Sequence, residues 1–71
     1  MDLREELQVV LEQIKHLQRH IRLCDRTIRT AIHQETKNRA MRDKCRAENE
    51  LFDLEVDRDR LREEIEGLDF K

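Results

Sequence analysis

Residues 3–31 of the chain read LREELQVVLEQIKHLQRHIRLCDRTIRTA. The apolar residues of this stretch recur at alternating steps of four and three, which is the heptad repeat of a coiled coil. A single helix with such a stripe leaves it exposed to water, so the stripe predicts a partner helix. Nine residues follow the repeat without a break: Leu3, Leu7, Val10, Ile14, Leu17, Ile21, Cys24, Ile28 and Ala31.

The composition favours long helices over other fold classes. The chain has 71 residues, of which 45% are charged and 3% aromatic, with no proline and one glycine. A chain of this length forms at most one domain and rarely builds a sufficient core alone. Scarce turn signals argue against strands, and the periodic apolar residues with a net charge of only −2 argue against a disordered tail. We therefore expect an all-α fold.

A second heptad register appears later in the chain. It places Ala40, Ala47, Leu54, Leu61 and Leu68 at d positions, and Lys37, Lys44, Leu51, Arg58 and Ile65 at a positions. The two registers differ by two residues, and neither a stutter nor a stammer alone repairs that mismatch. Residues 1–71 are thus predicted to form a single coiled-coil segment, with a first-register seam over 2–32, a polar basic discontinuity over 33–46 and a second-register seam over 47–68.

Two architectures satisfy this pattern. The favoured one is a long continuous helix that dimerises in parallel, with a register discontinuity near residues 33–46, since Ile at a with Leu or Val at d selects two strands. The alternative is a helical hairpin, or an antiparallel coiled coil forming a helical bundle. A hairpin would turn near Glu35–Arg39, with a loop around 36–38. It would pair Leu7 with Leu68, Ile14 with Leu61, Ile21 with Leu54 and Ile28 with Ala47. The predicted turn contains no glycine or proline, but Asn38 tolerates the left-handed conformation.

The pattern also predicts the helix ends and the residues of the dimer seam. Asp2 is placed to cap the first helix, and Gly67 is the expected helix stop. The predicted dimer seam consists of Leu3, Leu7, Val10, Ile14, Leu17, Ile21, Cys24, Ile28, Leu51, Leu54, Leu61, Ile65 and Leu68.

Two further stripes run along the predicted helices. The basic ridge, made of Lys15, Arg19, Arg22, Arg26 and Arg29, lies opposite the first-register seam. It is either a solvated outer face or a contact for an acidic partner. The outer stripe, made of Met41, Cys45, Phe52 and Val56, points away from the second-register seam. It is either a gradual transition from the first heptad register to the second, or a docking surface for another helix or a second dimer.

No set of residues with catalytic spacing is present, so we expect no enzyme activity and no cofactor. Carboxylates are plentiful, but they lie on predicted exposed helical faces without a pocket to shift their pKa values. His16, His20 and Cys24 are spaced four apart, yet all three span too great a length to share one metal ion, so we expect no metal site. No segment has the length of a membrane span.

Residues 38–46, NRAMRDKCR, resemble the basic region of the bZIP transcription factors at Asn38, Arg39, Lys44, Cys45 and Arg46. The resemblance covers nine residues and implies DNA binding by a zipper dimer. Met41 and Arg42 stand where the family has paired alanines, and Asp43 would direct a negative charge toward phosphate. The leucine ladder expected after Arg46 is absent, so we do not expect nucleic acid to be the partner.

The functional expectation is therefore association. The sequence predicts a structural, dimerising rod segment of a larger cytoskeletal, centrosomal, motor-adaptor or trafficking protein, located in the cytoplasm and able to associate with the cytoskeleton. Its partner would be a second copy of the chain or another coiled-coil helix. The alternative is a helical binding module that presents the basic ridge or the outer stripe to an acidic or helical partner, and a nucleic-acid-binding zipper ranks third.

Overall fold

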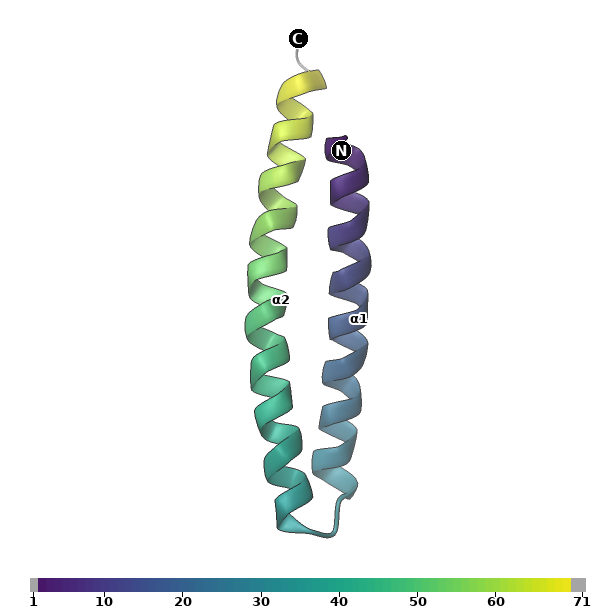
Figure 1. Ribbon diagram of the computed structural model, residues 1–71, viewed down its shortest axis with the longest axis vertical. Helices are drawn as coiled ribbons and strands as arrows, with labels where there is room; N and C mark the ends of the chain where they lie inside the picture. Colours follow the sequence, from purple (N-terminus) through teal and green to yellow (C-terminus); the bar gives the residue numbers. More distant parts are fainter. Residues whose placement is uncertain (1, 70–71) are drawn as a thin grey trace.

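The computed structural model describes residues 2–69, which form two long helices joined by a short turn. Helix α1 spans Leu3–Thr30 and α2 spans Gln34–Asp69. The helices run antiparallel, side by side along their length, so that the first and last described residues lie at the same end (Figure 1). The molecule is a narrow rod of 58 × 17 × 14 Å. All regular structure within residues 2–69 is helical.

The expectation of one continuous helix is wrong, because the chain reverses direction at residues 31–33. The hairpin alternative is confirmed, but its turn lies nearer the N-terminus than the predicted loop at 36–38. Regular helix resumes at Gln34 and continues through Arg46. The register discontinuity over residues 33–46 stays a prediction. The heptad register between chains, the strand orientation in an assembly and the number of chains stay predictions.

Local competition for hydrogen bonds explains why α1 ends at Thr30. The hydroxyls of Thr27 and Thr30 donate to the carbonyls of Leu23 and Arg26 at 3.0 and 2.8 Å. Such side-chain bonds to the preceding turn weaken a helix, and β-branched residues have low helix propensity. Ala31 then adopts an extended conformation while its N–H still donates to the Thr27 carbonyl at 2.8 Å. The chain thus turns without glycine or proline.

Helix α2 begins at Gln34 and runs through residues 36–38, which the sequence assigned to the loop. The N–H of Lys37 donates to the carbonyl of His33 at 3.2 Å, and the Gln34 amide donates to the Asn38 side-chain oxygen at 3.0 Å. Glu35 lies in the first turn, where a negative charge favours the positive end of the helix dipole. Asn38 is helical, and none of the described residues has a positive φ.

The predicted start of α1 is confirmed, whereas the predicted end of α2 is wrong. The cap at Asp2 is confirmed, because its side chain accepts a hydrogen bond from the N–H of Arg4 at 3.4 Å. The stop at Gly67 is wrong, because α2 continues to Asp69 and Gly67 has no positive φ. A glycine in a helix lowers stability but does not terminate it unless the chain takes the left-handed conformation there.

The core of the hairpin is a single strip between the two helices, which we call the inner seam. Val10, Ile14 and Leu61 form its buried centre, and Leu3, Leu7, Leu51 and Leu54 pack against them. Cys24, Ala40 and Ala47 are also buried, nearer the turn. From Lys37 to Ile65, every a and d residue of the second register is buried or half-buried. That register therefore marks the face of α2 that packs on α1.

Within the described range, neither α1 nor α2 is apolar enough over a sufficient length to cross a bilayer.

Candidate association surfaces

The residues predicted for a dimer seam lie, for the most part, between the two helices of one chain. Val10, Ile14, Cys24 and Leu61 are buried, and Leu68 is exposed by 59%. The remaining eight are half-buried: Leu3, Leu7, Leu17, Ile21, Ile28, Leu51, Leu54 and Ile65. Because one chain already covers these residues with its own second helix, the hairpin needs no second copy to close the inner seam. A seam between chains stays a prediction.

The two helices meet in a register different from the pairing expected for a hairpin. Leu54 lines the same groove as Gln13 and Leu17, whereas the sequence-based pairing placed it opposite Ile21. At the turn end, Ile28 lines one groove with Met41 and Lys44, whereas the sequence-based pairing placed it opposite Ala47. These offsets correspond to about one heptad, which preserves which residues face inward while changing their partners. Heptad periodicity alone cannot distinguish such shifts.

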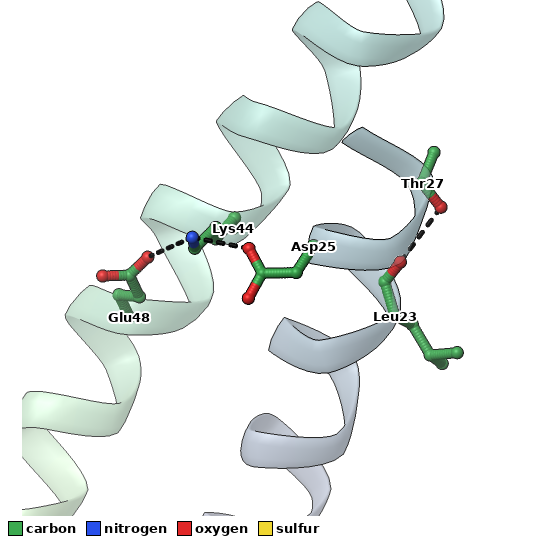
Figure 2. Close-up of polar contacts among 5 residues, drawn as sticks. All are labelled: Leu23, Asp25, Thr27, Lys44 and Glu48. Carbon is green, nitrogen blue, oxygen red and sulfur yellow. Dashed lines mark hydrogen bonds and ion pairs between the residues drawn. The ribbon is translucent and has the colours of Figure 1, made fainter. Parts of the chain in front are cut away.

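An ion pair joins the helices at the turn end of the inner seam. The Lys44 ammonium lies 2.6 Å from a carboxylate oxygen of Asp25 on α1 and 3.9 Å from Glu48, one turn along α2 (Figure 2). The hydrogen bond and the negative charge of Asp25 raise the pKa of Lys44 above its ordinary value. Lys44 occupies an a position, so its alkyl stem covers the seam while its charge reaches Asp25 at the edge. This pair could not be predicted from the sequence, because it depends on the interhelical register.

Cys24 is buried in the inner seam with a protonated, shielded thiol. Burial raises the pKa of Cys24, and the nearby carboxylates of Asp43 and Asp25 raise it further, while Lys44 acts in the opposite direction. Its sulfur lies 3.7 Å from the Nε2 atom of His20. Because the thiolate is the reactive form, this thiol is poorly placed for redox or nucleophilic chemistry. Among residues 2–69, no group of three His, Cys, Asp or Glu side chains is arranged to hold a metal ion.

The outer stripe stays uncovered when the hairpin forms. Met41, Phe52 and Val56 are exposed by 50%, 67% and 52%, and Cys45 is also exposed. Met41 and Cys45 line a shallow groove on α2 with Arg42, Arg46 and Asn49, and they also border the groove between the helices that Asp25 and Ile28 line. The stripe follows the helical repeat, so its apolar side chains lie on one side of α2. Helix α2 therefore carries one apolar face toward α1 and a second one toward solvent.

The basic ridge is exposed along α1. All five of its residues are exposed, and within residues 2–69 none of them forms an ion pair. Lys15, Arg19 and Arg22 line a small surface depression with Gln18. The turn brings Arg26 and Arg29 to the same end of the rod as the basic start of α2. Residues 15–46 carry ten Lys or Arg and three Asp or Glu, a net charge of +7 around the turn.

The segment that resembles a bZIP basic region lies in the first three turns of α2. Ala40 is buried and Lys44 is paired with Asp25, so one side of this segment packs on α1. A basic region that reads DNA enters the major groove as a free helix. In the hairpin, α1 occupies one side of that helix.

Comparisons with known proteins assign no family. A scan against protein-family models, a search of curated proteins and a search of solved structures each return no match.

Proposed function

We propose that the chain is a structural association module that acts by packing against another helical chain. The observation that carries the proposal is the outer stripe, which stays exposed on α2 after the inner seam has closed. Apolar side chains that line one helical face and lie in water contribute stability only when another surface covers them. The hairpin supplies a rigid support for this stripe. The cellular setting, a rod segment of a cytoskeletal, centrosomal, motor-adaptor or trafficking protein, stays a prediction from the sequence.

Sedimentation equilibrium over a range of concentrations tests this proposal. The wild-type chain should show a mass above the 8.7 kDa of one copy. Phe52→Gln should return it to one copy without loss of helix signal in circular dichroism. Leu23→Gln is the matched control, because Leu23 is 57% exposed and points away from α2 (Figure 2). A wild-type chain that stays a single copy at every concentration, or a Phe52→Gln variant that still associates, would contradict the proposal.

A second function is favoured by the basic ridge, namely binding of an acidic protein partner. The five ridge cations are exposed on one helix face and form no ion pair with another described residue, and they lie within a segment of net charge +7, so they attract anions at long range. The ridge contains no aromatic residue, which gives no support for base stacking with nucleic acid.

Polyglutamate binding at increasing salt tests this second function. Arg22→Gln with Arg26→Gln should weaken binding and reduce its salt dependence. The control, Arg60→Gln with Arg62→Gln, removes the same charge from exposed positions of α2 at the opposite end of the rod. Equal losses from the two double variants would show a general charge effect and reject a role for the ridge.

A further inference from the structure

The outer stripe has the same spacing in both directions. Its residues are separated by four, seven and four positions, from Met41 through Cys45 and Phe52 to Val56. When two copies of α2 are laid antiparallel about a point between Glu48 and Asn49, Met41 falls level with Val56 of the second copy. Cys45 then falls level with Phe52. Every apolar residue of the stripe meets an apolar residue, and both pairings occur twice, as a twofold axis requires.

We infer that the outer stripe of α2 is a homodimer interface, in which a second copy of this chain docks antiparallel about a twofold axis between Glu48 and Asn49. This inference rests on the proposed function and specifies its partner and geometry. The large side chain of Phe52 lies opposite the small side chain of Cys45, which suits close packing of two helices. The resulting assembly contains four helices, with each inner seam closed inside its own chain.

The distribution of charge favours this antiparallel arrangement over a parallel one. The antiparallel pairing sets residues 34–46 of one copy beside residues 51–63 of the other. Residues 34–46 hold five Lys or Arg and two Asp or Glu, a net charge of +3. Residues 51–63 hold three Lys or Arg and five Asp or Glu, a net charge of −2. Arg42 of one copy falls level with Glu55 of the other. A parallel dimer would instead place the basic segment of one chain beside the same basic segment of the other, where like charges repel.

The polar residues at the centre of the interface define its register. Asn49 and Glu48 interrupt the apolar stripe at its midpoint, and both are exposed in the single hairpin. In the antiparallel dimer, Asn49 of each copy falls level with Glu48 of the other. A shift by one heptad would set Glu48 level with Val56 in one direction, or Asn49 level with Met41 in the other, and burying a polar group against an apolar side chain is costly without a hydrogen-bond partner. A single polar residue in an apolar helical stripe fixes register in this way.

Disulfide mapping tests this geometry. In a Cys24→Ala background, Cys45 is the one remaining thiol of the chain. The antiparallel register separates the two copies of Cys45 by seven residues, or about 10.5 Å along the axis. That exceeds the reach of a disulfide. The background chain should therefore resist oxidation to a covalent dimer. Adding Phe52→Cys should give a covalent dimer whose peptide map contains the Cys45 to residue 52 linkage between copies.

A second variant retains Phe52 in case its loss weakens the dimer. In a Cys24→Ala, Cys45→Ser background, Met41→Cys with Val56→Cys should crosslink residue 41 of one copy to residue 56 of the other. Linkages between identical positions, in either variant, would show a parallel dimer and overturn the inference. A dimer mass in sedimentation without any crosslink in either variant would overturn this register while leaving the proposed function intact. A single-copy mass for the wild-type chain would overturn both.

Discussion

The two ends of the inner seam are built from different side chains. Toward the open end, large aliphatic residues meet: Val10, Ile14 and Leu61 with Leu3, Leu7, Leu51 and Leu54 around them. Toward the turn, the buried residues are Cys24, Ala40 and Ala47, with an ion pair at the edge. The open end gains more from apolar burial, whereas the turn end is held together by a short covalent connection. Stability should therefore be concentrated at the end where the chain is not joined.

The largest effect should come from removing aliphatic volume at the open end. Leu61→Ala should lower the free energy of unfolding by about 2–5 kcal/mol, because it removes the buried transfer energy and leaves a cavity. Chemical denaturation monitored by circular dichroism measures this change. Leu68→Ala is the matched control, since Leu68 is 59% exposed, and it should change stability by less than about 0.5 kcal/mol. Equal effects at the two positions would contradict the assigned seam.

The second-largest loss of stability should come from adding side-chain volume near the turn. Ala47 is only 4% exposed, so Ala47→Leu should force the helices apart locally and cost about 1–3 kcal/mol. The same denaturation experiment reports it. A gain in stability would show that the alanine end of the seam is loosely packed rather than closely filled, and the contrast between the two ends would lose its basis.

Alkaline pH should weaken the turn end selectively. The native pKa of Cys24 is raised, so above the ordinary thiol value of 9.0 the unfolded chain loses this proton while the folded chain keeps it. The native pKa of Lys44 is also raised, so the same argument applies above 10.5. Stability should be fully present below pH 9 and should fall as pH rises through the raised native pKa of each group.

Unfolding curves collected between pH 7 and 11 test this prediction. In a Cys24→Ala variant the decline between pH 9 and 10.5 should disappear, while the decline above 10.5 should stay. If the variant and the wild-type chain follow the same curve, the thiol does not lie in the buried environment described here.

The smallest effect should come from the ion pair itself. Lys44→Met keeps the apolar stem and removes the charge, and the Lys44 and Asp25 side chains are 33% and 40% exposed. We therefore expect a loss of less than about 1 kcal/mol, because partly exposed ion pairs are screened by water and salt. Measuring the same variant at high salt should shrink the difference further. A loss comparable to that of Leu61→Ala would reverse the proposed ranking of the two ends.

The inward faces of both helices could be predicted from the sequence, because heptad periodicity reports which residues share a side. The location of the turn could not, because Thr27 and Thr30 end the helix through bonds to their own backbone rather than through glycine or proline. The hairpin register also escaped prediction, since a shift of one heptad keeps the same faces inward. The ion pair between Lys44 and Asp25 follows from that register, so it was missed with it. The outer stripe and the basic ridge were found by spacing, and the structure adds their exposure.

The most direct test of the hairpin is the distance between two spin labels, one near each end of the chain. Glu5 and Glu63 are exposed, and each can be replaced by cysteine and labelled in a Cys24→Ala, Cys45→Ser background. The hairpin brings both labels to the open end, on helices whose axes lie about 10 Å apart. The account predicts a short distance that persists when labelled chains are diluted with unlabelled ones. A distance near 87 Å, as a continuous helix requires at 1.5 Å per residue, or a short distance that vanishes on dilution, would contradict it.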